Sequence, residues 1–267
     1  MSRSTILSAL LVVLAALVLA SCTAADEEQV AQTLQRAAKA TEGLGMVVTM
    51  SGSVSGEGIS QPLRSRATIA PDGRHARMST TVGGLSLDQY LDGHFMLMGV
   101  DSMPGAGMNL PPGTRYLKVD VDKVNKSVGI DTTMSEMQSL DPRRAAAMLS
   151  DAAEVKSVGS DTIGGVKVTR YAADVDLEQM AKALSKGADT SRFSKMLGDA
   201  EMRMEIAIDG DDRIRGFGMK GDMGPAKYEM DAVVQSYSRD LKVTIPSRGV
   251  YDMTAAITGA FDGLETP

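Results

Sequence analysis

The chain contains few side chains whose types and spacing could support catalysis. Its two histidines, His75 and His94, lie in a strand-rich region without the spacing to acidic residues that metal sites use. Asp209, Asp211 and Asp212 could hold Ca²⁺, but the rest of a metal loop is missing, and a hydrated hairpin turn is favoured. We therefore expect no metal ion, no cofactor and no enzymatic activity.

Two glycine patterns match nucleotide-binding motifs in their letters alone. Residues 216–221 read Gly-Phe-Gly-Met-Lys-Gly, but the dinucleotide motif must open a helix, and here an irregular strand and a turn are expected. Residues 159–164 have the spacing of a phosphate-binding loop, but Gly165 and Val166 stand where Lys and Ser or Thr are required. Neither segment is expected to bind a nucleotide.

Cys22 is the single cysteine of the chain and the residue with the best-defined chemistry. It follows Leu19-Ala20-Ser21 at the end of an apolar run that begins behind Arg3, a pattern typical of bacterial lipoprotein signal peptides. One cysteine cannot form an internal disulfide. The pattern predicts removal of residues 1–21 and stable anchoring by acyl chains on Cys22. An ordinary secretory signal with a chance cysteine is the alternative.

Length and charge limit the remaining function classes. The chain has 267 residues and a formal net charge of −6, which argues against nucleic acid as a partner. No second apolar segment approaches membrane-spanning length, so anchoring would depend on Cys22 alone. We expect residues 22–27 to form a tether and residues 28–267 a single domain, exported to the outer face of the cell membrane in the cell envelope.

Alternating apolar and polar residues predict a large antiparallel sheet with one apolar face, interrupted by helices. Its central hairpin turns at Gly164-Gly165, and a loop at 101–113 carries apolar side chains that suit a flap, a membrane contact or simple packing. The expected strands are 46–54, 63–70, 74–82, 85–91, 95–100, 116–120, 155–158, 166–174, 202–209, 213–220, 227–236 and 241–245. The expected helices are 28–41, 134–140, 141–152, 177–186, 191–197 and 251–261.

The apolar residues have an unusual composition. The chain has 19 Met, four Phe, six Tyr and no Trp, and flexible Met side chains suit both irregular cores and adaptable binding surfaces. Periodicity does not separate a Met-packed core from a cavity, because an inward residue is inward in both. The candidate lining residues are Met46, Val48, Met50, Ile69, Met78, Leu85, Leu87, Met148, Met180, Leu184, Met202, Met204, Ile206, Met230 and Val234.

Four segments resemble the LppX, LprA, LprF and LprG group of actinobacterial lipoproteins and, more distantly, the LolA and LolB lipoprotein carriers. The most specific is 158–171, Val-Gly-Ser-Asp-Thr-Ile-Gly-Gly-Val-Lys-Val-Thr-Arg-Tyr, which resembles the hairpin of the group. The group's Trp-x-Lys strand is resembled by residues 116–120, where Tyr116 stands in place of Trp. Its late hairpin is resembled by residues 206–215, and its closing strand by residues 243–246. The departures are Arg170, where many relatives carry His, and the absence of Trp.

The resemblance implies an α+β fold in which a highly curved antiparallel sheet, about half a barrel, wraps several helices and encloses an apolar cavity. It also implies a lipid or lipoglycan ligand, with a membrane transporter as a further partner, since no nucleotide motif is present to drive exchange. The alternative is a structural or interaction lipoprotein with the same fold, a filled core and an active outer surface.

Overall fold

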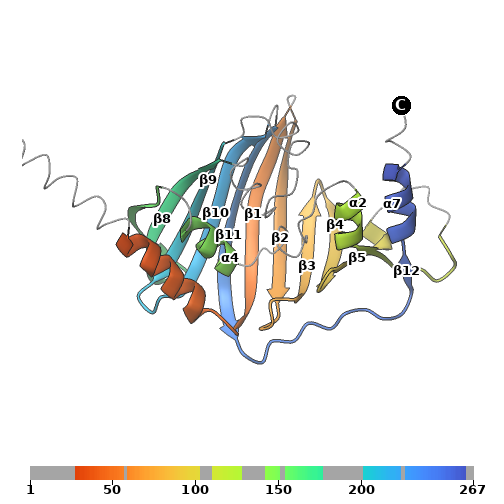
Figure 1. Ribbon diagram of the computed structural model, residues 1–267, viewed down its shortest axis with the longest axis horizontal. Coiled ribbons are helices and arrows are strands. Elements are labelled where there is room, and N and C mark those ends of the chain that lie inside the picture. The colour runs from red at the N-terminus through yellow and green to blue at the C-terminus, as the bar shows by residue number, and fades with distance from the viewer. Residues whose placement is uncertain are drawn as a thin grey trace, which may run out of the picture.

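The computed structural model of the protein describes residues 28–56, 59–102, 110–127, 142–150, 154–176, 201–223 and 226–262. Twelve strands form one curved sheet across these ranges (Figure 1). The strands are β1 (Gly45–Gly56), β2 (Ile59–Ile69), β3 (His75–Val82), β4 (Leu85–Asp92), β5 (Phe95–Gly99), β6 (Tyr116–Asp120), β7 (Lys156–Ile163), β8 (Val166–Asp176), β9 (Glu201–Asp209), β10 (Ile214–Met223), β11 (Ala226–Ser238) and β12 (Val250–Asp252).

The sheet consists of two meanders joined by one central pair of strands. The order is β12-β6-β5-β4-β3-β2-β1-β11-β10-β9-β8-β7, so β1 from the first meander pairs with β11 from the second. All neighbours are antiparallel except β12 and β6, which are parallel. The predicted α+β fold with a large, curved, unclosed sheet is confirmed, and the expectation of a purely antiparallel sheet is wrong at this edge.

Close backbone approach holds the central pair together at Gly52. A Cβ atom placed on Gly52 would lie 2.2 Å from the carbonyl oxygen of Glu229 on β11. No real side chain tolerates that distance, so glycine is required where β1 crosses β11. Gly52 pairs with Leu63 on β2 and with Met230 on β11, so this close approach lies between two apolar residues.

Among the described residues, the helices gather at the two ends of the sheet. A helix at residues 28–40 and α4 (Pro142–Ser150) lie over β8, β9 and β10 (Figure 1). At the other end, α2 (Val121–Ser127) and α7 (Thr254–Asp262) pack on each other and beside β5 and β6. A short 3-10 helix, η1 (Val100–Ser102), follows β5.

A small set of hydrogen bonds sets the bounds of α2 and α7. Asp120 accepts the backbone N–H of Lys123 at 3.1 Å, which is the geometry of a helix cap at the start of α2. The hydroxyl of Thr254 accepts the backbone N–H of Asp120 at 2.8 Å, and Asp252 accepts the backbone N–H of Thr254 at 2.9 Å. These bonds tie the start of α7 to the end of β6.

Most predicted elements are present, with specific corrections. Residues 241–245 are not a strand: they belong to an extended segment that crosses from β11 to β12. The predicted terminal helix begins three residues late, at Thr254, because Val250–Asp252 pairs with β6 as β12. Helix α2 was not expected. The helices predicted at 134–140, 177–186 and 191–197 lie outside the described residues.

Candidate functional site

The inward face of the central strands carries a buried apolar group, which we call the central cluster. Met46 and Val48 have no exposed surface, and Met50 is 3% exposed. Strand alternation places these side chains on one face of β1, and the paired residues of β2 and β11 continue that face. The central cluster comprises Met46, Val48, Met50, Ala67, Ile69, Phe217, Met230, Ala232 and Val234, with Ala76, Met78, Met219, Tyr228 and Tyr237 packed at its margin.

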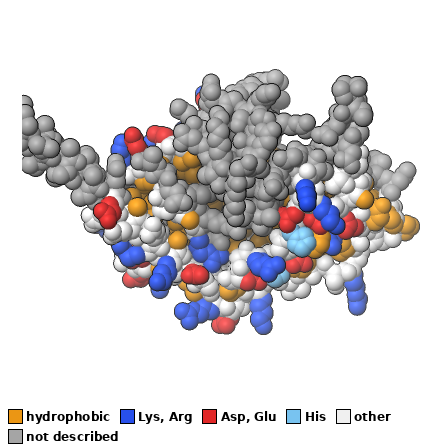
Figure 2. Space-filling model, in the orientation of Figure 1, with side chains coloured by type: hydrophobic (Ala, Val, Ile, Leu, Met, Phe, Trp, Pro, Cys, Tyr) orange, Lys and Arg blue, Asp and Glu red, His pale blue; other side chains and the backbone are white. Residues whose placement is uncertain are grey.

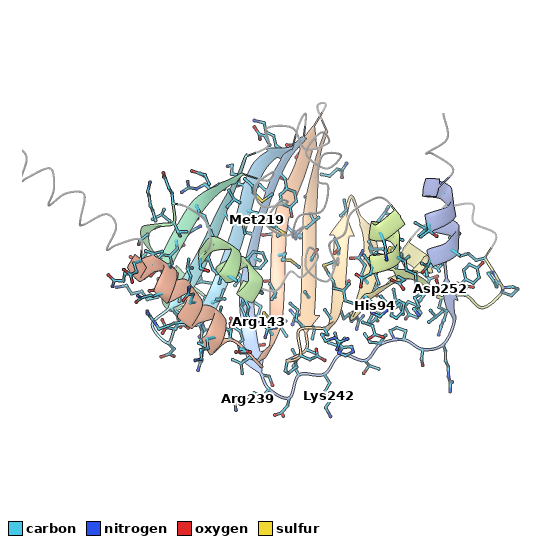
Figure 3. The ribbon with its side chains drawn as sticks, in the orientation of Figure 1. His94, Arg143, Met219, Arg239, Lys242 and Asp252 are labelled. Carbon is cyan, nitrogen blue, oxygen red and sulfur yellow. The ribbon has the colours of Figure 1, made fainter. Side chains whose placement is uncertain are left out.

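A second group, the end cluster, combines the same sheet face with helices. Leu34 and Ala37 of the first helix and Ala146 and Leu149 of α4 are fully buried in it. Their partners come from β8, β9, β10 and the residue before β7: Val155, Ala173, Met202, Met204, Ile206, Ile208 and Ile214. Met219, labelled in Figure 3, packs against both clusters and so marks their boundary.

The structure divides the predicted lining residues between these two groups. The central cluster or its margin contains seven of them: Met46, Val48, Met50, Ile69, Met78, Met230 and Val234. Met202, Met204 and Ile206 instead pack under helices in the end cluster. Leu85 is 56% exposed and Leu87 half-buried near a hairpin tip. Met180, Leu184, Cys22 and the side chain of Met148 lie outside the described residues.

Sequence reasoning missed Phe217, Ala67 and Ala232 in the central cluster. The sequence predicts an irregular strand in this region, and it forms β10, in which strict alternation from Ile214 does not place Phe217 on the inward face. The pairing of β10 with β9 shifts between Ile214 and Gly216, so the inward positions run Ile214, Phe217 and Met219 rather than every second residue. A spacing of three followed by two in an apolar strand is the signal of a bulge.

One hydroxyl pair interrupts the apolar inward face. The hydroxyl groups of Ser65 on β2 and Thr80 on β3 lie 2.8 Å apart, and both residues are buried. Ser65 pairs with Met50, so this hydroxyl pair borders the central cluster. Each hydroxyl satisfies the other and retains capacity for a further hydrogen bond.

His75 has two carboxylate partners, so the expectation that it stands apart from acidic residues is wrong. Its Nδ1 lies 2.5 Å from Asp72 and its Nε2 3.1 Å from Asp92. Burial acts to raise the pKa of Asp72, but the Arg74 backbone N–H and His75 outweigh it and lower that pKa. Both ring nitrogens of His75 face carboxylates at the start of β3. The cluster joins two turns of the sheet.

Asp209 is a structural residue at the end of β9. Its side chain is 3% exposed and accepts hydrogen bonds from the backbone N–H groups of Asp211 and Arg213 and, at 2.6 Å, from the guanidinium of Arg215. Burial raises the pKa of Asp209, but these donors outweigh burial and hold it below the ordinary value. The predicted turn is present, and the interaction of Asp212 with Arg36 at 3.1 Å joins it to the first helix.

The outward face of β7–β9 carries alternating charges. Arg170, which replaces the histidine of many relatives, lies 2.6 Å from Glu205 and 3.1 Å from Asp161. Arg203 lies 3.2 Å from Glu205 and 3.5 Å from Asp174. Basic and acidic side chains are also interspersed along the lower border of the view in Figure 2. This outward surface is polar, in agreement with the predicted division between the two faces.

The described residues contain neither a metal-binding group nor a helix that could span a membrane. Within those ranges, no group of three or more His, Cys, Asp or Glu residues is arranged to hold a metal ion. None of the helices in the described part of the chain has the length and apolar character needed to cross a bilayer. The central cluster is the candidate site because it gathers buried apolar side chains from neighbouring strands on one face of the sheet.

Solved structures with a similar fold include two mycobacterial proteins. LprF from Mycobacterium bovis matches 82% of this chain and 97% of its own, with 15% identity and a TM-score of 0.43. The lipoprotein LppX from Mycobacterium tuberculosis matches 81% of this chain and 99% of its own, with 11% identity and a TM-score of 0.44. The fold resembles that of LprF and LppX. The resemblance indicated by the sequence motifs is confirmed at this level.

A third similar structure is MucB of Pseudomonas aeruginosa, solved with MucA. It matches 81% of this chain and 61% of its own, with 12% identity and a TM-score of 0.35. No protein-family model and no curated protein matches the chain. At these identities the likeness concerns the fold alone, and ligand binding is argued below from this chain's own residues.

Proposed function

We propose that this protein is a cell-envelope lipoprotein that binds or carries lipids or lipoglycans on the inward face of its sheet. The supporting observation is the central cluster. Among the described residues, strands alone build it, whereas helices contribute to the end cluster. An apolar sheet face of this kind is unstable in water and is stabilised by an apolar cover. A lipid acyl chain supplies one, at about 0.8 kcal/mol for each CH₂ group buried.

The methionines of the central cluster suit such a ligand. Met46, Met50 and Met230 have flexible, polarizable side chains that fill irregular spaces and adapt to chains of different shape. Anchoring through Cys22, with residues 22–27 as a tether and residues 28–267 as one lipid-binding domain, completes the proposal. The absence of a catalytic or metal-binding role stays a prediction from the sequence.

Native mass spectrometry of the purified full chain, followed by lipid extraction, tests this function. We expect bound lipid in the wild type. The variant Ala232→Met adds a large side chain to the inward face, so it should lower the bound fraction. Val233→Met, on the opposite face of the same strand, is the matched control and should leave it unchanged. Protein that stays empty after incubation with offered lipids would overturn the proposal.

One observation favours a second candidate, an interaction lipoprotein with a filled core. Met46 and Val48 have no exposed surface, so the interior above them already excludes water. If protein atoms fill that space, Ala232→Met overpacks the core and lowers the stability by about 1–3 kcal/mol. If lipid fills it, the larger side chain displaces lipid instead, and the melting temperature changes little in delipidated protein. Thermal unfolding of that variant therefore separates the two candidates.

A further inference from the structure

Four partly exposed apolar side chains lie together at one end of β2–β4, and we call them the apolar rim. Leu85 is 56% and Val82 38% exposed, on either side of the Gly83-Gly84 turn. Leu63 pairs with Val82, and Val82 with Leu85, so their side chains share one face. Leu87 follows on that face two residues after Leu85, which completes the rim of Leu63, Val82, Leu85 and Leu87.

The apolar rim is continuous with the central cluster. Leu63 pairs with Gly52, and Gly52 pairs with Met230, which belongs to the central cluster. The row runs Leu85, Val82, Leu63, Gly52 and Met230, and Gly52 is its one member without an apolar side chain. An acyl chain lying along this row would contact apolar side chains from the sheet end to the interior.

Two arginines, Arg64 and Arg66, lie on the face of β2 opposite the apolar rim. Arg64 and Arg66 are exposed on the outward face of β2, and neither forms an ion pair with any residue that the structure describes. Asp88, the nearest carboxylate along β4, lies 3.6 Å from Arg77. In a chain with a formal net charge of −6, this end of the sheet therefore combines exposed apolar groups with available positive charge.

The β1–β2 hairpin next to the apolar rim carries little charge. The β1–β2 pair continues beyond the row of Leu63, as far as the pairing of Gly56 with Ile59. Residues 53–62 read Ser-Val-Ser-Gly-Glu-Gly-Ile-Ser-Gln-Pro and contain a single charge, Glu57. With one acidic residue, this stretch adds little electrostatic repulsion toward an anionic surface.

We propose that the apolar rim contacts an anionic lipid bilayer, with Val82 and Leu85 entering the acyl boundary and Arg64 and Arg66 meeting anionic headgroups. Exposed apolar area next to basic residues is the combination by which proteins bind at such interfaces. The biological role of this contact rests on the proposed lipid-carrying function, because the contact would make this end of the sheet the entrance through which lipid reaches the central cluster. Binding of the rim to a bilayer is tested separately from lipid carriage.

The chain contains no tryptophan, so a single introduced Trp is a fluorescent probe without background from other tryptophans. The full chain carrying Leu85→Trp is combined with vesicles of phosphatidylglycerol and phosphatidylcholine, with or without brominated acyl chains. Val158→Trp, at a 44% exposed apolar position on β7, is the matched control. We expect a blue shift and several-fold stronger bromine quenching at Leu85→Trp than at Val158→Trp. Val82→Trp should repeat the result, and melting curves verify that each variant is folded.

Charge dependence separates bilayer contact from lipid held in the interior. Arg64→Gln and Arg66→Gln should each weaken the association about fivefold, since a basic residue near an anionic surface contributes about 1 kcal/mol. High salt and purely phosphatidylcholine vesicles should also reduce the quenching. Equal quenching at both tryptophans overturns the proposal, as does no quenching at either. Quenching that survives high salt and the arginine substitutions places the lipid in the interior and overturns the bilayer contact while supporting carriage.

Discussion

The end cluster and the central cluster belong to one sheet, yet their described residues come from different kinds of element. In the end cluster, Leu34 and Leu149 come from helices and are fully buried against β8–β10. In the central cluster, the described residues all come from strands, although Met46 and Val48 are buried just as deeply. The same inward alternation therefore packs against helices at one end, and in the middle it forms the apolar face on which we propose that lipid binds.

The largest expected effect lies in the end cluster, at Leu149. Leu149→Ala leaves a space between α4 and the sheet that rigid neighbours fill only in part. We expect a loss of about 2–5 kcal/mol in the free energy of unfolding, measured by denaturant titration. Exposed Ala147 on the same helix supplies the control, because Ala147→Ser removes no buried group. A loss below 1 kcal/mol would mean that α4 is not part of a packed core.

Removing the carboxylate of Asp209 should have the next largest effect. Asp209→Asn leaves the guanidinium of Arg215 without its charged acceptor beside the end cluster. Hydrogen bonds to charged groups contribute about 1.5–3 kcal/mol, so we expect a loss of about 2 kcal/mol near neutral pH. Asp211→Asn is the control, since its side chain is exposed in the same turn.

The contribution of Asp209 also depends on pH. Its pKa is lowered in the folded protein, so the folded state binds the proton less readily than the unfolded state does. Its stabilisation is therefore present above the unfolded value of about 3.9 and is lost as the pH falls through the folded value. Below pH 4 the wild type and Asp209→Asn should converge in unfolding free energy. A difference in unfolding free energy between the two proteins that stays constant below pH 4 would contradict the stabilising role of ionised Asp209.

A smaller effect is expected at Met50 in the central cluster. If lipid covers this face, the acyl chain can relax into the space left by Met50→Ala, and the loss is about 1 kcal/mol when lipid is bound. Met50→Ala and Leu149→Ala are compared by thermal unfolding with and without added lipid. Added lipid should raise the melting temperature of Met50→Ala toward that of the wild type. It should not restore the melting temperature that Leu149→Ala loses. Equal losses without any lipid effect would show that both clusters are packed cores.

The sequence predicted the sheet better than it predicted what covers the sheet. Alternation at Met46, Val48 and Met50 identified the inward face, and Gly164-Gly165 identified the central hairpin, because both signals are local. Met46 and Met204 show the same pattern, yet one lies in the central cluster and the other under helices. That difference depends on contacts between residues far apart in the chain, which periodicity does not contain.

Two further differences have the same origin. The side chain of Asp92 reaches His75 only because β3 pairs with β4, so a search for nearby acidic residues in the sequence overlooks it. The segment at 241–245 alternates like a strand, but it has no strand partner in the described structure and crosses to β12 instead. Strand formation requires a free edge in the right place, and that is a property of the whole sheet.

The smallest effect on folding is expected at Cys22, which belongs to neither cluster. Cys22→Ala should release the protein from the membrane fraction or leave its signal peptide uncleaved, because the acyl chains proposed there have no other attachment point. The free energy of unfolding should stay the same, since the described part of the first helix, residues 28–40, is fully buried only at Leu34 and Ala37, well beyond Cys22. Fractionation and denaturant titration of the same variant measure the two properties. Full membrane retention of protein whose signal peptide has been removed would instead identify the apolar rim as a sufficient contact, and substitution of Leu85 by Gln in that background should then abolish retention.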